Sequence, residues 1–322
     1  MSRHVSIIIP CYNARPWIEE TIASAVANCG PGDEIVVIDD GSSDGSSEVV
    51  RERFPDVPLI QTPNRGVSHA RNLGIEKSSG EYLVFLDADD LLTPGKIARQ
   101  KQIADRTGVD VVYGNWQRLR TGPDGKYAVA ETVERQMTGI PEIELFLGFW
   151  CPTGAYLFRR RIVDKVGGFN LRLPVIQDQR FVIDCATHGA TFEHDHEVAC
   201  LYRVHTSGSV STRSQAQFLR DCLTNAPEVR DWWEAHGGIT QERNHALFEV
   251  FNMVAIGAQE LDQELFEQAC TEIHHLQPDP LRWRRPVIRL LESFIGYRKS
   301  VVVRSKVRTL KRVVSKRIRK TR

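Results

Sequence analysis

Long apolar segments and targeting signals are missing from this sequence. The longest apolar stretch, residues 143–158, is interrupted by Glu144, Pro152 and two glycines, so it does not suit a membrane-spanning helix. The first four residues lead directly into a strand-like run, without the apolar core of a secretory signal. These absences predict a protein of the cytoplasm.

A disulfide framework and a zinc-binding pattern are also missing. The seven cysteines are odd in number, scattered along the chain and without any CxxC pair. Such a set is typical of reduced thiols in a cytoplasmic protein and makes a zinc site an unlikely use of them.

The sequence has no glycine-rich loop that would hold phosphates. Gly30-Pro31-Gly32 leads into an expected strand rather than a helix, and no GxxxxGK[ST] pattern occurs. Nucleotidyl transfer to a sugar phosphate would want such a loop after the first strand, where this chain has Pro10-Cys11-Tyr12-Asn13. A bound phosphate would therefore be held by a metal and by side chains.

Charge is distributed unevenly along a chain of otherwise ordinary composition. Of the 322 residues, 41% are hydrophobic and 26% charged, as in a soluble globular protein. From Arg282 to the last residue there are 16 Lys and Arg against the single acid Glu292, a net charge of +15, so the rest of the chain carries about −14. The tail is therefore strongly basic, whereas the rest of the chain is acidic.

Short apolar runs alternate with helical patterns in the first third of the chain. Expected strands cover residues 5–9, 34–38, 59–60 and 82–86, and expected helices cover residues 16–27 and 67–77, with a further helix after Asp44 as its N-cap. Strands and helices that alternate at short intervals predict an α/β fold with a parallel, doubly wound sheet.

Polar residues follow the expected strands where each one ends. The central example is GEYLVFLDADDLLTP at residues 80–94, in which Asp87, Asp89 and Asp90 end a buried strand. Carboxylates crowded there repel one another unless a cation lies among them, and hard oxygen ligands suit Mg²⁺ or Mn²⁺. The loops at residues 10–12 and 39–40 are expected at the same sheet edge, which is where such folds bind nucleotides. An acidic surface turn that caps the next helix is the structural alternative.

Later segments add a second set of candidate residues. A strand at 109–113 precedes an excursion at 120–136 with a turn at 122–125, and residues 142–150 read as an apolar helix. Asp178 stands at the front of another apolar helix, where its structural alternative is to cap that helix. A strand at 197–202 precedes Arg203 and His205.

Six motifs in order resemble the family 2 glycosyltransferases with the GT-A fold. The motifs are VSIIIPCYNA, IVVIDDGSSDGS, NRGVSHARNLGIEKSSGEYLVFLDADD, GGFN, QDQRF and YRVHTSGSVS, and together they cover roughly residues 4–212. The resemblance implies a Rossmann-like, mostly parallel sheet flanked by helices. It also implies transfer of a sugar, with inversion, from a nucleotide diphosphate donor, usually UDP-linked, to a hydroxyl of a glycan or lipid-linked acceptor, as in polysaccharide biosynthesis.

Individual roles follow from the same resemblance. It assigns donor-nucleotide binding to Pro10, Tyr12, Asn13, Asp39, Arg71 and Asp87, a Mn²⁺ or Mg²⁺ ion to Asp89 and His205, and the catalytic base to Asp178. Tyr12 as a packing residue and His205 as an ordinary loop histidine stay open as alternatives.

One position departs from the family pattern. The family usually has Glu-Asp where this chain has Gln177-Asp178, so the base is kept and the neighbouring acid is lost. A non-catalytic protein that keeps the nucleotide-sugar pocket is therefore the alternative function.

The last third of the chain predicts helices and then a basic tail. Residues 1–212 are expected to form the transferase domain, residues 213–280 a helical subdomain and residues 281–322 a basic tail. Within the tail, residues 301–318 have an amphipathic pattern that would suit peripheral contact with an anionic membrane on its inner face, and a solvated tail is the alternative. Nucleic acid is not expected as a partner, because aromatic residues are few near the densest charge.

Overall fold

The computed structural model describes residues 4–122, 125–205, 215–276, 288, 290, 292 and 295–303. The chain divides into two compact units, Met1–Arg213 and Ser214–Arg322. Part of the turn expected at 122–125, the motif residues after His205 and most of the expected amphipathic segment 301–318 lie outside the described residues. The three-part division of the chain stays a prediction.

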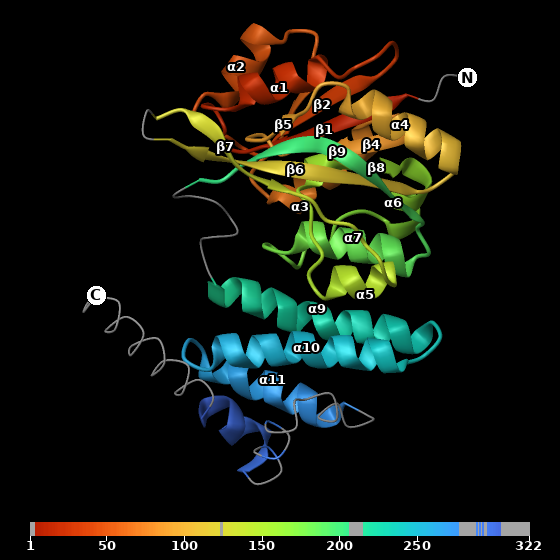
Figure 1. Ribbon diagram of the computed structural model, residues 1–322. Helices are drawn as coiled ribbons and strands as arrows, with labels where there is room; N and C mark the ends of the chain where they lie inside the picture. The colour runs from red at the N-terminus through yellow and green to blue at the C-terminus, as the bar shows by residue number, and fades with distance from the viewer. Residues whose placement is uncertain are drawn as a thin grey trace, which may run out of the picture. The chain divides into compact units, whose positions relative to one another are not determined.

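A single mixed sheet forms the centre of the first unit (Figure 1). Among the described residues, its strand order is β3-β2-β1-β4-β8-β6-β9-β5, and β7 pairs with β6 beside this path. The strands are β1 (Val5–Cys11), β2 (Glu34–Asp39), β3 (Leu59–Gln61), β4 (Tyr82–Phe85), β5 (Leu91–Leu92), β6 (Val111–Thr121), β7 (Tyr127–Val133), β8 (Tyr156–Arg159) and β9 (Phe192–Arg203).

Only one half of this sheet is parallel throughout. Strands β1 to β4 pair in parallel, as their alternation with helices predicts. The other half is mixed, because β8 lies antiparallel between β4 and β6, whereas β6 and β9 are parallel. The expectation of a parallel sheet therefore holds for the strands up to residue 85 and, beyond them, for the β6–β9 pair alone among the described strands.

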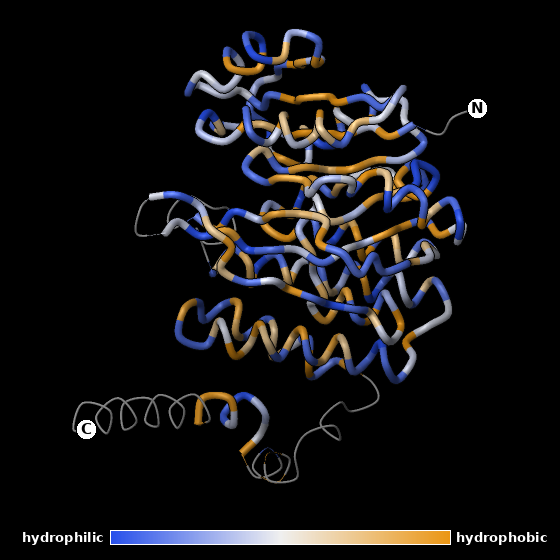
Figure 2. The backbone as a smooth tube through the Cα atoms, turned by 45° about the horizontal axis from the view of Figure 1, so that its top comes forward, coloured by the Kyte–Doolittle hydropathy of each residue, from blue (hydrophilic) through white to orange (hydrophobic). Residues whose placement is uncertain are grey.

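Helices cover both faces of the sheet. In Figure 1, α1 (Ile18–Val26), α2 (Ser46–Arg53) and α4 (Lys96–Thr107) lie on one face, and α3 (Val67–Lys77), α6 (Arg160–Val166), α7 (Gln177–Thr187) and the short α5 (Pro141–Phe146) lie on the other. Figure 2 shows hydrophobic residues concentrated in the strands between these layers. On the α1 side, Ile7, Ile22 and Val84 belong to one buried cluster, so burying these side chains holds the layers together.

Helix α3 packs unusually close to the sheet. It has the bounds that its sequence predicts, Val67–Lys77. A Cβ added at Gly74 would lie 2.3 Å from Cγ2 of Ile8 on β1, so glycine is needed for this close approach. The approach brings the side of α3 that carries Arg71 against the carboxyl end of the sheet.

Two local expectations are corrected. Asp44 was expected to cap α2, but the N-cap position belongs to Gly45, whose φ of 90° favours glycine. Asp44 instead accepts hydrogen bonds from the backbone N–H groups of Ser46 (3.0 Å) and Arg15 (2.9 Å) and so joins two loops. The helix expected at 142–150 ends at Phe146, shortly before Gly148 takes a φ of 101°.

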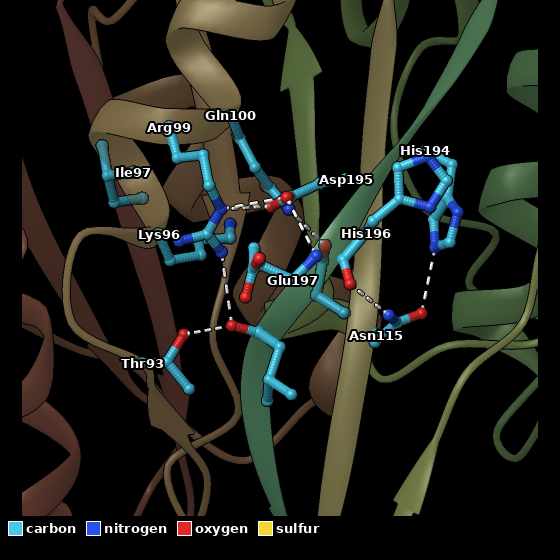
Figure 3. A network of polar contacts seen from close by, with 12 residues as sticks. Thr93, Lys96, Ile97, Arg99, Gln100, Asn115, His194, Asp195, His196 and Glu197 are labelled. Carbon is cyan, nitrogen blue, oxygen red and sulfur yellow. Dashed lines mark hydrogen bonds and ion pairs between the residues drawn. The ribbon is translucent and has the colours of Figure 1, made fainter.

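Strands β6 and β9 are much longer than the sequence predicts. Polar contacts fix the start of β9, as Figure 3 shows: Arg99 of α4 pairs with Asp195 at 2.9 Å, and Asn115 of β6 bonds the His194 ring at 3.0 Å. Thr93 also donates to the carbonyl of Val198. These contacts fix β9 along its course. Arg203 at its end and His205 just after it therefore lie beside the carboxyl end of β4.

The second unit contains the helices that periodicity predicts. They are α9 (Gln215–Ala235), α10 (Gln241–Ala258) and α11 (Gln263–His275). The side chain of Thr240 caps α10 by accepting from Arg243 N–H, and that of Asp262 caps α11 by accepting from Leu265 N–H. Among the described residues, no helix is both long and apolar enough to cross a membrane.

Candidate active site

The loops after β1 and β2 form one wall of the candidate site. The two strands are in register, with Cys11 opposite Asp39. Asn13, which has a φ of 49°, donates its backbone N–H to Ser42 Oγ at 3.0 Å and accepts from Ser43 N–H at 2.9 Å. Pro10 is buried at the end of β1, whereas Tyr12 is 52% exposed. The ring of Tyr12 is therefore available to a ligand.

Asp39 is held as a carboxylate at this wall. Burial favours its neutral form, but hydrogen bonds from Ser42, Ser47 and the Gln61 amide outweigh burial and lower the pKa of Asp39. A charged carboxylate here has the chemistry needed to accept hydrogen bonds from a base or ribose.

Asp40 has a role that the sequence analysis did not find. Its two carboxylate oxygens accept from the backbone N–H groups of Arg65 (2.9 Å) and Gly66 (2.8 Å), just before α3 begins. This negative charge at a helix N-terminus stabilises α3 and fixes its start relative to β2.

Arg71 joins Asp87 to the helix that carries the expected base. Its guanidinium, which is 2% exposed, donates to Asp87 Oδ1 at 2.5 Å and to Gln177 Oε1 at 2.6 Å, and it lies 5.0 Å from the centre of the Phe169 ring. The expectation that Arg71 binds the donor stays a prediction; in the structure its guanidinium orients the Asp87 carboxylate.

Asp87 lies within electrostatic reach of both Asp89 and Asp178. Burial raises the pKa of Asp87, Arg71 opposes that rise, and the nearby charges of Asp89 and Asp178 add to it. Asp90 is buried beside them, and burial together with Asp89 and Asp87 raises its pKa well above the ordinary value. Burial and mutual repulsion therefore disfavour the charged forms of Asp87 and Asp90.

Asp89 and His205 are in direct contact although 116 positions separate them. His205 Nε2 lies 2.8 Å from Asp89 Oδ2, and its Nδ1 lies 3.0 Å from the hydroxyl of Tyr127. The ring of Trp17 packs on the imidazole with 4.4 Å between ring centres. Both expected metal ligands therefore meet at one point.

Arg203 is a second residue that the sequence analysis left without a role. Its side chain, 3% exposed, donates to the carbonyl of Asp89 at 2.7 Å and pairs with Glu20 of α1. Its backbone N–H donates to Asp90 at 2.9 Å. Arg203 thereby holds the acidic loop against the end of β9. A charged residue just after a strand gives no local signal for such burial.

Asp178 lies at the start of α7, as expected. Trp150 Nε1 donates to its Oδ2 at 2.9 Å, and the backbone N–H of Gln179 donates to its Oδ1 at 2.8 Å. These two bonds orient the carboxylate, and each oxygen keeps a lone pair for a further partner. Trp150 also contacts the rings of Trp116 and Tyr202 edge to face, so aromatic side chains lie beside the Asp178 carboxylate.

The residues present fit a divalent metal held together with a diphosphate. Among the described residues, no group of three or more His, Cys, Asp or Glu side chains is arranged to hold a metal ion. Asp89 and His205 supply two donors, and metals that work on nucleotides take their remaining ligands from phosphate oxygens and water. The Tyr127 contact at Nδ1 leaves Nε2 as the metal-facing nitrogen.

Comparisons with known proteins place this geometry in a family. The family model described as Glycosyl transferase family 2 matches residues 6–167, half of the chain. The chain belongs to glycosyltransferase family 2. The match includes β1 to β4 from residue 6 onward, together with Asp39, Arg71, Asp87 and Asp89.

Two relatives of this glycosyltransferase match over most of its length. An uncharacterized glycosyltransferase from Nostoc is 28% identical over 244 residues, which cover 69% of this chain and 71% of the relative. WfaP of Escherichia coli, a UDP-Glc:alpha-D-GlcNAc-diphosphoundecaprenol beta-1,3-glucosyltransferase, is 28% identical over 230 residues, which cover 67% and 83%. Two other curated relatives are 35% identical to this chain, but the matched residues span only 18% and 46% of their lengths.

Solved structures establish the fold as GT-A. TarS of Staphylococcus aureus, residues 1–349, superposes with a TM-score of 0.65 at 17% identity over 92% of this chain and 88% of TarS. TarS in complex with UDP-GlcNAc gives a TM-score of 0.63 at 18% identity, over 86% and 82% of the two chains. At such identities the likeness concerns the fold alone.

Proposed function

We propose that this glycosyltransferase uses a UDP-linked donor and a divalent metal, and transfers the sugar with inversion to a hydroxyl of a glycan or lipid-linked acceptor. The observation that carries the proposal is the Asp89–His205 pair, 2.8 Å apart, beside Asp87 and Asp178. WfaP, whose name states a UDP-Glc donor and a lipid diphosphate acceptor, and TarS solved with UDP-GlcNAc support the choice of donor and acceptor class.

The nucleotide would lie along the ends of β1, β2 and β4. Exposed Tyr12 offers a ring face to the base, and the charged Asp39 accepts from base or ribose. Pro10 and Asn13 shape the intervening turn. Asp87, fixed by Arg71, accepts from a hydroxyl of the ribose or the donor sugar.

Asp89 and His205 would hold Mn²⁺ or Mg²⁺. When bound, the metal would offset the negative charge that the departing nucleotide diphosphate gains. The protein supports this site through Arg203, which fixes the Asp89 backbone, and through Tyr127 and Trp17, which fix the imidazole.

Asp178 would act as the general base of a single displacement. As the acceptor oxygen attacks the anomeric carbon, its proton passes to the Asp178 carboxylate. The bond from that carbon to the diphosphate breaks with its electron pair on the leaving oxygen, so the configuration inverts and no covalent enzyme intermediate forms. Trp150 and Gln179 hold the carboxylate in place for this transfer.

Replacement of Asp178 tests the catalytic role. With UDP-glucose and a synthetic GlcNAc-diphospholipid as probes, we expect Asp178→Asn to lose at least about 100-fold in transfer, the lower range for a general base, and to keep UDP binding. Asp164→Asn, which changes an exposed acid on α6, is the matched control. Full transfer by Asp178→Asn would favour another base.

The alternative function is a non-catalytic protein that binds a sugar nucleotide. The glutamine at position 177, where the family usually has an acid, favours this alternative. It predicts that the wild type binds the nucleotide without transferring a sugar.

We also propose peripheral membrane contact through residues 301–318, at the cytoplasmic face where lipid-linked acceptors would be presented. The support is the amphipathic, basic sequence of this segment. Full-length chain should sediment with vesicles containing phosphatidylglycerol at low salt, and a chain truncated after residue 303 should not. Equal sedimentation of the two would contradict the contact.

A further inference from the structure

His205 is enclosed by residues from three separate parts of the chain. Its side chain is 11% exposed, with Asp89 at Nε2, the Tyr127 hydroxyl 3.0 Å from Nδ1 and the Trp17 ring 4.4 Å away between ring centres. Trp17 immediately precedes α1, Asp89 follows β4, and Tyr127 opens β7. An imidazole fixed on so many sides has one orientation, with Nε2 toward the acidic loop.

Tyr127 comes from a strand that otherwise faces solvent. Residues 128–132 of β7 are exposed, and β7 pairs with β6 beside the main path of the sheet, in the hairpin that projects at the left in Figure 1. Tyr127 itself is partly buried. Its ring lies 5.3 Å from the Arg203 guanidinium, the same group that donates to the Asp89 carbonyl. Tyr127 of the hairpin therefore contacts both His205 and Arg203, the residue that holds the acidic loop.

The Tyr127 hydroxyl can complement both neutral forms of His205. Without a metal, Nε2–H donates to the Asp89 carboxylate, and Nδ1 accepts from the hydroxyl. With a metal, Nε2 must present its lone pair, so Nδ1 carries the hydrogen and donates to the hydroxyl oxygen. A hydroxyl both donates and accepts, so it satisfies Nδ1 in each case.

We propose that Tyr127 is a positioning residue for metal binding, which holds the His205 ring with Nε2 toward the acidic loop, supports the form in which Nε2 can ligate, and makes the β6–β7 hairpin part of the donor site. The inference rests on the proposed metal role of Asp89 and His205. Partners that orient a ligating histidine in this way contribute about 10–100-fold to metal affinity.

The test is Mn²⁺ affinity in the presence of saturating UDP, measured from the free Mn²⁺ signal in electron paramagnetic resonance. Tyr127→Phe keeps the ring over Arg203 and removes only the hydroxyl. We expect Mn²⁺ to bind about 10–100-fold more weakly to this variant, with the thermal unfolding midpoint little changed. Tyr82→Phe is the matched control, because it removes a hydroxyl that also bonds a polar side chain, Asp105 at 2.6 Å, at the start of β4.

His205→Ala distinguishes a failure of the Tyr127 role from a failure of the metal site itself. Wild-type affinity in Tyr127→Phe with loss in His205→Ala would overturn the role of Tyr127 and leave the metal site standing. Wild-type affinity in His205→Ala would overturn the metal site and the role of Tyr127 together. An equal loss in Tyr82→Phe would show a general effect of hydroxyl removal and would also overturn the proposal.

A second readout follows the histidine directly. In the complex with UDP and diamagnetic Mg²⁺, nitrogen NMR of the wild type should show His205 with its hydrogen on Nδ1. A hydrogen on Nε2 in that complex would contradict the assignment.

Discussion

Arg71 Nη1 donates to Gln177 Oε1 at 2.6 Å, while its Nη2 donates to Asp87. The position where this chain departs from the family pattern is therefore bonded to the arginine that orients the donor-side carboxylate. With a neutral partner at 177, the guanidinium forms its ion pair, within the described part of the chain, with Asp87. Gln177 also opens α7, so this contact ties Arg71 and Asp87 to the helix that carries Asp178.

The first prediction concerns this contact. Gln177→Leu leaves Arg71 Nη1 without its acceptor in a buried place, and we expect the free energy of unfolding to fall by about 1–3 kcal/mol. Gln177→Glu keeps an acceptor of the same shape and should cost less. Urea unfolding of the two variants measures the difference, and equal stability of Gln177→Leu and the wild type would contradict the role of the contact.

The second prediction concerns Arg203. Arg203→Met leaves the carbonyl of Asp89 unpaired, so we expect a loss of about 1–3 kcal/mol in unfolding free energy together with weaker Mn²⁺ binding, because the acidic loop is no longer fixed. Glu20→Gln removes only the outer partner, which is 68% exposed, and should cost less than about 1 kcal/mol. Similar losses in both variants would show that the ion pair, rather than the carbonyl contact, matters.

The third prediction is a pH dependence that arises from Lys96. This lysine of α4 is fully buried, its Nζ donates to the Tyr156 carbonyl at 2.7 Å, and burial lowers its pKa to about 7. The unfolded chain keeps the proton up to about pH 10.4, the reference pKa of lysine. Between these values the unfolded state binds more protons, so rising pH favours the folded state.

Comparison with Lys96→Met isolates this contribution. The cost of burying the lysine is fully present below pH 7 and is relieved as the pH rises toward 10. The wild type should therefore gain stability relative to Lys96→Met, by on the order of a few kcal/mol between pH 7 and 10. Lys165→Met is the control, because Lys165 is exposed and also donates to a carbonyl, that of His188 at 2.6 Å. A flat difference for Lys96→Met would refute the lowered pKa.

Local pattern predicted the parallel half of the fold well. The runs at 5–9, 34–38 and 82–86 are buried strands, and α3 has its expected bounds, because apolar runs and helical spacing are signals within a short stretch. The antiparallel insertion of β8 between β4 and β6 depends on pairing between distant segments, which short stretches do not encode. The start of β9, with His194, Asp195 and His196, reads as polar and gave no strand signal.

The sequence predicted the site residues that lie within the family motifs. It did not predict the residues that reach the site from segments distant in sequence. Resemblance pointed to Asp89 and His205, and the structure brings them together. Tyr127, Trp150 and Arg203 lie in segments read as an excursion, a helix end and a loop. Their roles depend on the hairpin, the turn after α5 and the long β9, so only the folded chain reveals them.

Calorimetric titration of UDP, GDP, CDP and dTDP, each with and without Mn²⁺, tests the central claim most directly. We expect UDP binding to strengthen at least about 10-fold with Mn²⁺, and that increase to be lost in Asp89→Ala, which removes the proposed carboxylate ligand of the metal. Glu131→Ala on the exposed hairpin is the control and should bind as the wild type does. UDP binding with no dependence on Mn²⁺ or on Asp89 would contradict the metal-dependent donor site.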